Sequence, residues 1–180
     1  MPRKPPGRTP EIRPSTPDDH SALASLYPAV FPNEDLVPLV DALLRIGDEV
    51  VSLVTSHSSS VTGHLVMTPC AVDPAGGRAG LLGPLAVAPD WQGRGLGTAL
   101  VREGLARMES VGAWRVCVLG DPGYYGRFGF SPESRLLPPY PLPEEWRDAW
   151  QSIALGGADS RLTGQLVVPE PWRRPELWGP

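Results

Sequence analysis

One segment of the chain constrains its fold more than any other. It begins with an almost wholly apolar run, Gly80–Ala88, and continues through a glycine-rich turn into a helical pattern that ends near Val111. A continuous apolar run of this length is typical of a strand buried on both faces. Val101, Leu105 and Met108 then recur at the spacing of one helix face. The segment therefore predicts a buried strand, a tight turn and an amphipathic helix within an α/β fold.

The composition supports a folded chain and excludes several classes of protein. The chain has 180 residues, of which 41% are hydrophobic and 20% charged, a globular balance that suits one domain. Its net charge is -4, whereas nucleic-acid binders usually carry a basic excess. No stretch approaches the roughly 18 consecutive apolar residues of a membrane span. Residues 1–10 lack the apolar core of a signal peptide, so we expect a cytoplasmic protein.

Patterns on either side of the central segment predict further elements. We expect strands at Glu11–Pro14, Val50–Thr55, Val61–Thr68, Arg115–Leu119 and Leu166–Val168, and helices from Thr16 to Tyr27, over Glu34–Ile46, within Gly120–Gly129 and over Leu142–Trp150. Pro84 lacks an N–H group, so it predicts a bulge or local splaying in the Gly80–Ala88 strand. Cys70 and Cys117 lie in apolar runs without metal-ligand spacing, which favours buried free thiols over a disulfide.

The turn between strand and helix is the segment most suited to binding a ligand. It reads Gln92-Gly93-Arg94-Gly95-Leu96-Gly97-Thr98. Glycines at alternate positions let a ligand approach the backbone, and the first N–H groups of the helix have no intrahelical partner. These donors and the helix dipole favour a phosphate or diphosphate. The spacing fits neither a P-loop, whose lysine is missing, nor the GxGxxG fingerprint. A turn without a ligand remains the alternative.

The pattern Gln92-x-x-Gly95-x-Gly97, placed between an apolar strand and an amphipathic helix, resembles the acetyl-coenzyme A signature of the GCN5-related N-acetyltransferases (GNAT). The block from Leu119 to Phe130, with its paired tyrosines, is similar to a subgroup of small, mostly bacterial N-acetyltransferases. The resemblance covers about residues 11–135. It implies an enzyme that transfers the acetyl group of acetyl-CoA, by direct attack, to a primary amine of a small molecule or protein. The resemblance implies acetyl-CoA as the co-substrate and no metal.

The resemblance also implies an architecture. We expect a GNAT fold of the α/β class, with a mixed, mainly antiparallel sheet of about six or seven strands, splayed at the cofactor cleft and covered by helices on both faces. Residues 1–10 are then a disordered tail, and residues 11–180 one domain. Within that domain, residues 11–135 carry the motifs and residues 136–180 shape the acceptor side. Neither nucleic acid nor membrane is an expected partner, and a homodimer is compatible with the family.

Carried onto this sequence, the family pattern assigns site residues. In the family the diphosphate rests on the turn amides, and the pantetheine arm pairs with the preceding strand, whose N–H groups also stabilise the oxyanion. The implied cofactor contacts are Leu85, Ala86, Val87, Gln92, Gly93, Arg94, Gly95, Leu96, Gly97 and Thr98. Tyr125 lies four residues before Gly129, the position of the tyrosine that protonates the leaving thiolate. Tyr124 is the alternative candidate for this role.

The general base is the part of this assignment that stays open. Gly80–Ala88 holds no Asp or Glu, where relatives often carry one. His64, Glu34 and Asp35 are candidates, each with a structural alternative, and His64 is expected to face solvent because it alternates with Leu65. The missing base leaves a second hypothesis, a non-catalytic acyl-CoA sensor or interaction module.

Two further features have competing interpretations. Asp121 is better placed to cap the short helix than to take part in catalysis. Trp146, Trp150, Trp172 and Trp178 near the C-terminus suit an acceptor pocket, a dimer contact or plain packing equally well.

Overall fold

The computed structural model describes residues 11–157 and 161–180, so the predicted tail at residues 1–10 lies outside them. The described strands form one nine-stranded sheet. They are β1 (Glu11–Pro14), β2 (Val51–His57), β3 (Ser60–Pro74), β4 (Arg78–Val87), β5 (Ala113–Leu119), β6 (Ser131–Pro132), β7 (Leu136–Leu137), β8 (Trp150–Ala154) and β9 (Gly164–Val167). Their order is β1-β2-β3-β4-β5-β8-β6, with β9 pairing with β3 and β7. Among these pairs β4–β5 and β7–β9 are parallel and the others antiparallel, which confirms the predicted mixed sheet.

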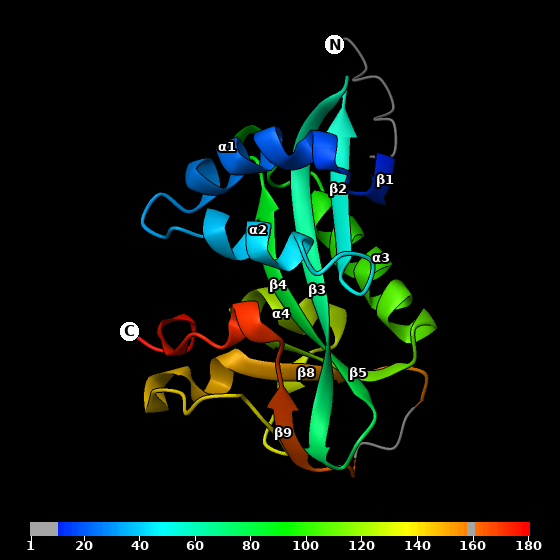
Figure 1. Ribbon diagram of the computed structural model, residues 1–180, viewed down its shortest axis with the longest axis vertical. Coiled ribbons are helices and arrows are strands. Elements are labelled where there is room, and N and C mark those ends of the chain that lie inside the picture. Colours follow the sequence, from blue (N-terminus) through cyan, green and yellow to red (C-terminus); the bar gives the residue numbers. More distant parts are fainter. Residues whose placement is uncertain (1–10, 158–160) are drawn as a thin grey trace, which may run out of the picture.

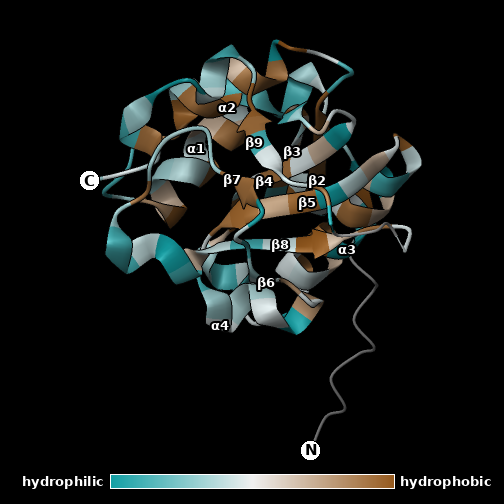
Figure 2. Cartoon of the chain, turned by 90° about the horizontal axis from the view of Figure 1, so that it is seen from below, coloured by the Kyte–Doolittle hydropathy of each residue, from teal (hydrophilic) through white to brown (hydrophobic). Residues whose placement is uncertain are grey.

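Helices cover both faces of this sheet (Figure 1). The α-helices are α1 (His20–Val30), α2 (Val37–Leu44), α3 (Leu96–Ser110) and α4 (Pro122–Tyr125), and 3-10 turns lie at Pro17–Asp19, Pro89–Trp91, Gly126–Phe128, Glu144–Ala149, Glu170–Trp172 and Pro175–Leu177. The helices α1 and α2 pack on one face, where Leu23, Leu39 and Val40 are buried. The helix α3 packs on the other and buries Leu100 and Met108. Seen from below, the central strands β4 and β5 are largely hydrophobic and α4 is hydrophilic (Figure 2).

The first helix does not end where the sequence predicts. We expected Pro28 to stop it at Tyr27, but α1 continues through Pro28 to Val30. Proline removes one helical N–H, whose acceptor would be the carbonyl of Ala24, and both residues are exposed, so that carbonyl remains open to water. The buried face of the helix is unaffected, and the Phe31 N–H donates to the Tyr27 carbonyl at 2.8 Å.

The second helix is shorter than predicted at its N-terminal end. It begins at Val37 instead of Glu34, with Pro38 in its first turn, a position that proline favours. Residues 31–36 therefore form a loop between α1 and α2. That loop carries Phe31 and Glu34 to the cleft described below.

One helix prediction near the C-terminus is wrong, and one strand there was missed. The segment Leu142–Trp150 holds only a 3-10 turn, and the strand β8 that follows it was not predicted. Gln151 and Ser152 are buried polar residues, so β8 lacks an apolar pattern. The Gln151 side-chain amide donates to the Gly120 carbonyl at 3.1 Å, and Ser152 is hydrogen-bonded to the Arg115–Glu133 ion pair. Specific hydrogen bonds, which periodicity does not reveal, stabilise this strand.

The prediction that His64 faces solvent is wrong, since its side chain is 0% exposed. Its Nδ1 lies 2.8 Å from the Tyr27 hydroxyl of α1, and its Nε2 lies 2.8 Å from the Ser52 hydroxyl of β2. Burial lowers the pKa of His64 to about 3, so the ring stays neutral. His64 links helix α1 to the sheet and is no candidate for a solvent-accessible base.

Candidate active site

A cleft of about 1080 Å³ lies where β4 and β5 separate. The parallel pairing of these strands ends at Leu82 and Val118. Beyond that point the described partner of β4 is β3 alone, with Leu85 opposite Leu65 and Val87 opposite Gly63. One extra residue of β4 at Gly83–Pro84 interrupts the β3 register, which confirms the predicted bulge. The edge of β4 that faces away from β3 is therefore open along Leu85–Val87.

Burial along β4 changes at the same bulge. Residues 79–82 are buried, as expected for a strand covered on both faces, but Leu85 and Val87 are half-exposed and line the cleft. Ala86 points the opposite way and is 1% exposed, packed against Leu26 and Tyr27 of α1 in the same core cluster. The predicted double-sided burial holds only for the first half of the strand.

The glycine-rich turn closes one end of the cleft. Gly95 is the N-cap of α3 with φ +83°, a left-handed conformation that glycine adopts without cost. The first helical hydrogen bond runs from the Ala99 N–H to the Gly95 carbonyl, so the N–H groups of Leu96, Gly97 and Thr98 have no intrahelical acceptor. These three residues line the cleft. The turn thus presents free backbone donors to the cleft, at the positive end of the helix dipole.

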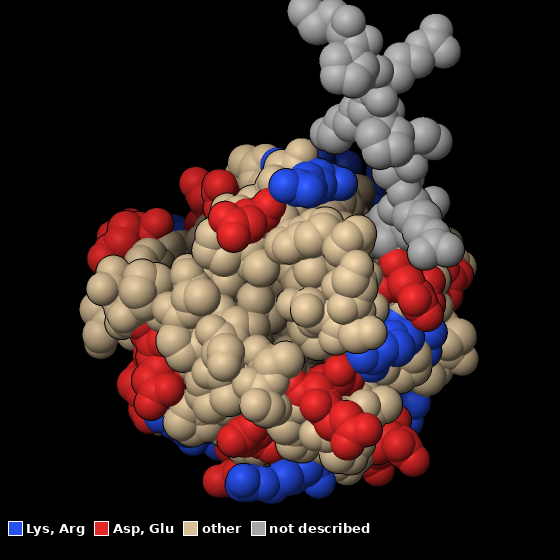
Figure 3. All heavy atoms as spheres, turned by 90° about the horizontal axis from the view of Figure 1, so that it is seen from above, with Lys and Arg blue, Asp and Glu red and all other residues tan. Residues whose placement is uncertain are grey.

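Side chains brace the turn from outside. The Gln92 Nε2 donates to the Val87 carbonyl at 3.0 Å and so ties the turn to the end of β4. Arg94 does not line the cleft; its guanidinium lies over the Trp91 ring, 4.7 Å from the centroid. The face seen from above carries its charged side chains toward the rim and is uncharged at its centre (Figure 3). Backbone N–H groups therefore line this end of the cleft, and Arg127, whose guanidinium lies 4.4 Å from the Tyr124 ring centroid, is the basic side chain among the described lining residues.

Of the predicted cofactor residues, the structure brings most into the same cleft. Those that line it are Leu85, Val87, Gln92, Gly93, Gly95, Leu96, Gly97 and Thr98. Ala86 and Arg94 are the exceptions, for the reasons of orientation given above. The contiguous segment from β4 to α3 therefore forms one wall.

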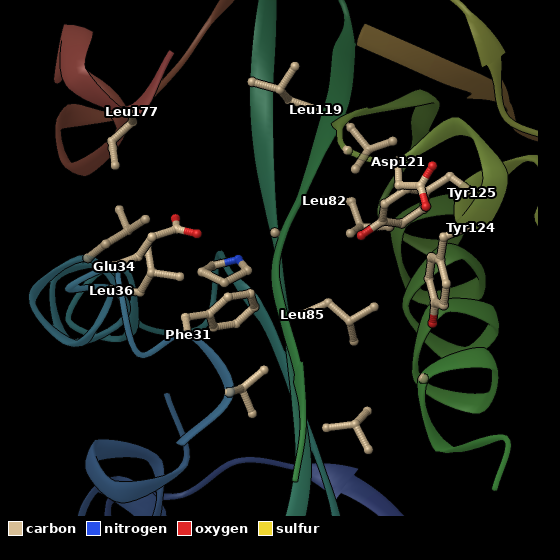
Figure 4. Close-up of a pocket in the computed structure, with 18 of the residues that line it drawn as sticks. Phe31, Glu34, Leu36, Leu82, Leu85, Leu119, Asp121, Tyr124, Tyr125 and Leu177 are labelled. Carbon is tan, nitrogen blue, oxygen red and sulfur yellow. The ribbon is translucent and has the colours of Figure 1, made fainter. Parts of the chain in front are cut away.

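Tyr124 and Tyr125 lie on the same side of the cleft but point in different directions (Figure 4). The Tyr124 hydroxyl lies against Gly97 in the first turn of α3 and leaves no room for a Cβ there. The Tyr125 ring packs against Gly120 and Phe130 and is directed toward Leu82, at the point where the strands part. Burial raises the pKa of the Tyr125 hydroxyl, which keeps it protonated at neutral pH.

Asp121 acts as the predicted helix cap. Its Oδ1 accepts a hydrogen bond from the Gly123 N–H at 2.8 Å, and it is the N-cap of α4. The residue also lines the cleft. Cys117 and Cys70 are free and buried, as expected, and burial raises the pKa of both thiols. Neither thiol is a nucleophile at neutral pH.

The opposite wall of the cleft comes from two distant parts of the chain. Phe31, Glu34 and Leu36 belong to the α1–α2 loop, and Trp172 and Leu177 to the C-terminal 3-10 turns. Figure 4 shows Phe31, Glu34, Leu36 and Leu177 on the other side of β4 from the tyrosines. The sequence predicts acceptor recognition by loops around Phe31–Leu36, Asp73–Arg78 and Leu136–Trp146; the first and third contribute to the cleft and the second does not. Leu177 was not predicted, because a single apolar residue in a loop carries no periodic signal.

The C-terminal tryptophans pack in the core and also line the cleft, which are two of the roles that the sequence left open. Trp172 and Trp178 are 8% and 2% exposed, with ring centroids 6.0 Å apart, and both also line the cleft. Trp146 lines the cleft as well, whereas Trp150 is buried beside Trp178. Core packing and the cleft wall are therefore made by the same aromatic cluster.

Of the three base candidates, Glu34 is the one that lines the cleft. His64 is enclosed in the core, and Asp35 is not among the lining residues. Within residues 11–157 and 161–180 no group of three or more His, Cys, Asp or Glu residues could hold a metal ion. Over the same residues, no helix is long and apolar enough to cross a membrane.

Comparison with known proteins identifies this arrangement. Residues 11–132 match the family model described as an acetyltransferase (GNAT) domain. The chain is 32% identical over 126 residues to the Escherichia coli protein named Uncharacterized N-acetyltransferase YjhQ, covering 67% of this chain and 70% of that one. It is 33% identical over 121 residues to Uncharacterized N-acetyltransferase YhbS of the same organism, covering 67% and 72%.

Solved structures agree with the sequence relatives. The crystal structure of the Escherichia coli GNAT family N-acetyltransferase YhbS in complex with CoA has a TM-score of 0.83 and 29% identity, and the match covers 96% of each chain. A GNAT family acetyltransferase from Brucella melitensis in complex with acetyl-CoA has a TM-score of 0.72 and 30% identity, covering 89% of this chain and 96% of that one. The overall fold is thus that of known acetyltransferases.

Proposed function

The chain belongs to the GNAT family of acetyltransferases, and we propose that it transfers the acetyl group of acetyl-CoA to a primary amine of a small molecule or protein by direct attack. One observation carries the proposal. The open edge of β4 at Leu85–Val87 leads directly to the free amides of the Gly93–Thr98 turn, and Tyr125 lies across the cleft from that edge. The sequence relatives, which are named N-acetyltransferases, support it.

The cofactor would be held by backbone rather than by charged side chains. The diphosphate accepts hydrogen bonds from the N–H groups of the turn and of the first turn of α3. Each such charge-assisted bond contributes about 1.5–3 kcal/mol, so three or four hold a diphosphate without a basic patch. The pantetheine arm extends the sheet along Leu85, Ala86 and Val87. That the two solved relatives were crystallised with CoA and acetyl-CoA supports this assignment.

Tyr125 is the proposed general acid. When the tetrahedral intermediate collapses, the C–S bond breaks and the thiolate takes a proton from the tyrosine hydroxyl. A β4 backbone N–H stabilises the oxyanion that forms when the amine attacks. Tyr124 is a poorer candidate because its hydroxyl lies against Gly97 of α3.

The attacking amine must first lose a proton. Glu34 is the candidate base that the cleft retains, and its carboxylate belongs to the wall opposite Tyr125. Acid and base would then act from opposite sides of β4, on the leaving group and on the amine respectively. Residues 136–180 complete this acceptor side within one domain that spans residues 11–180.

Release of CoA in the presence of a panel of amines tests the proposal. We expect acetyl-CoA to bind in calorimetry and at least one amine to be acetylated, with acetyl-amine and CoA formed in equal amounts. Tight binding of acetyl-CoA without turnover on any amine would instead support the non-catalytic sensor. No measurable affinity for acetyl-CoA would contradict both.

A further inference from the structure

The acceptor half of the cleft is apolar on most of its surface. Its lining includes Val30, Phe31, Leu36, Leu39, Leu177 and Trp178, which come from α1, α2, their connecting loop and the C-terminal turn. Phe31 is stacked on Tyr27 with ring centroids 6.2 Å apart, so its ring is supported from the core side. The pocket therefore offers a preformed hydrophobic surface to the body of the acceptor.

Two indole N–H groups of this wall are already used inside the protein. The Trp172 Nε1 donates to the Thr68 hydroxyl at 3.1 Å, and the Trp178 Nε1 donates to the Trp172 carbonyl at 3.1 Å. Neither donor is available to a ligand. A polyhydroxylated acceptor such as an aminosugar would lose hydrogen bonds to water here, and neither of these two donors would replace them.

The charges around the cleft leave one carboxylate for an incoming cation. Among the described lining residues the acidic ones are Glu34, Asp121 and Glu176. Asp121 caps α4, and Glu176 lies 2.9 Å from the Arg174 guanidinium. Within the described part of the chain, the Glu34 carboxylate has no ion-pair partner.

A ligand carboxylate, in contrast, meets no basic side chain among the described lining residues of this half, and the nearby Arg174 is paired with Glu176. Among the described lining residues Arg127 alone is basic, and it lies on the side of the tyrosines. Its Nε donates to the Tyr124 carbonyl at 2.9 Å, and its guanidinium lies 4.4 Å from the Tyr124 ring centroid. The carboxylate of a free amino acid would meet Glu34 and apolar side chains instead.

We propose that the acceptor is an apolar primary monoamine without a carboxylate, whose ammonium group approaches Glu34 and whose hydrophobic body lies against Phe31, Leu36 and Leu177. This inference rests on the proposed function and deepens it. One carboxylate matches one ammonium group, so a polyamine would leave its other charges in an apolar pocket.

The test compares amines at saturating acetyl-CoA by the rate of CoA release. Phenethylamine has the expected body; phenylalanine adds a carboxylate, ethanolamine lacks the body, and spermidine and glucosamine represent polyamines and aminosugars. Burial of an apolar group of this size favours binding by about ten- to one-hundred-fold. We expect kcat/KM for phenethylamine to exceed that for each of the others at least about tenfold.

The role of Glu34 is tested with a matched pair of variants. We expect Glu34→Gln to raise the KM for phenethylamine about tenfold, the loss of one charge-assisted contact, while the Kd for acetyl-CoA is unchanged. Glu49→Gln is the control, because Glu49 is exposed and is not among the residues that line the cleft. It should leave both constants unchanged.

Two results would overturn the inference alone. A kcat/KM for phenylalanine, ethanolamine, spermidine or glucosamine that equals or exceeds that for phenethylamine is one, and an unchanged KM in Glu34→Gln is the other. In both cases acetyl-CoA still binds and an amine is still acetylated, so the proposed function stands. Loss of acetyl-CoA binding in the unaltered protein would contradict the proposed function and the inference together.

Discussion

The two walls of the cleft are built in different ways. The cofactor wall is nearly contiguous in sequence, from Leu85 to Thr98, and acts through backbone groups at an open strand edge and a helix start. The acceptor wall joins the α1–α2 loop to C-terminal turns more than a hundred residues later, and acts through side chains. A contiguous backbone motif can be recognised from its glycines, whereas an assembled side-chain surface cannot. This is why the cofactor was predictable and the acceptor was not.

The largest expected effect concerns Tyr125 of α4, which lies across the cleft from the open edge of β4 in the cofactor wall. Replacing it with phenylalanine removes the proton for the thiolate but keeps the ring packed against Phe130. We expect kcat to fall by about 10²–10⁴-fold with little change in the Kd for acetyl-CoA. Steady-state kinetics on the best amine and calorimetry measure the two effects. Tyr124→Phe is the control, and a larger loss in that variant would transfer the role to Tyr124.

The second prediction concerns the turn. Gly95→Ala places a side chain on a residue with φ +83°, beside the free amides. The left-handed conformation costs an L-amino acid other than glycine about 1–2 kcal/mol. We expect the Kd for acetyl-CoA to rise about five- to thirtyfold while the preference among amines is retained. Gly126→Ala is the matched control, since Gly126 has φ −56° and open space around its Cα. Equal losses in both variants would contradict a specific role for the turn.

The sequence correctly predicted the elements that are determined by residues close together in the chain. The β2–β3 hairpin, the Pro84 bulge, the strand–turn–helix unit and the Asp121 cap were all confirmed. Predictions failed where contacts with residues far away in the sequence determine burial or strand formation. His64 is buried because the Tyr27 hydroxyl of another element satisfies it, and β8 depends on side-chain hydrogen bonds to Gly120 and Glu133.

His64 provides a third prediction, about what supports the acceptor wall. It is hydrogen-bonded to Tyr27, on which Phe31 is stacked. Its pKa is lowered to about 3 in the folded chain, against about 6.5 when unfolded. The unfolded chain binds more protons between these values, so the stabilisation is complete above about pH 6.5 and is lost as the pH falls.

The expected size of this loss is about 2 kcal/mol by pH 5, since each pH unit contributes about 1.36 kcal/mol. Urea unfolding at pH 7, 6 and 5 measures it. In His64→Gln this loss should be absent, whereas His57→Gln, at an exposed histidine, should retain it. The same pH dependence in both variants would show that other groups cause it.

The smallest expected effect distinguishes the contribution of the Gln92 side chain from that of the backbone amides in the cofactor wall. Gln92→Ala removes the hydrogen bond from the side chain to the Val87 carbonyl but leaves the backbone amides in place. A single neutral hydrogen bond contributes about 0.5–1.5 kcal/mol, so the Kd for acetyl-CoA should rise about two- to tenfold. A loss larger than that of Gly95→Ala, in the same calorimetric assay, would make the side chain more important than the backbone.

The central claim is that backbone amides hold the diphosphate and that the open edge of β4 holds the pantetheine arm. A crystal structure of this chain with CoA tests it most directly. The account predicts diphosphate oxygens within hydrogen-bonding distance of N–H groups between Gly93 and Thr98, and the arm paired with Leu85–Val87. A diphosphate bound by side chains elsewhere, or an arm lying outside the gap between β4 and β5, would contradict it.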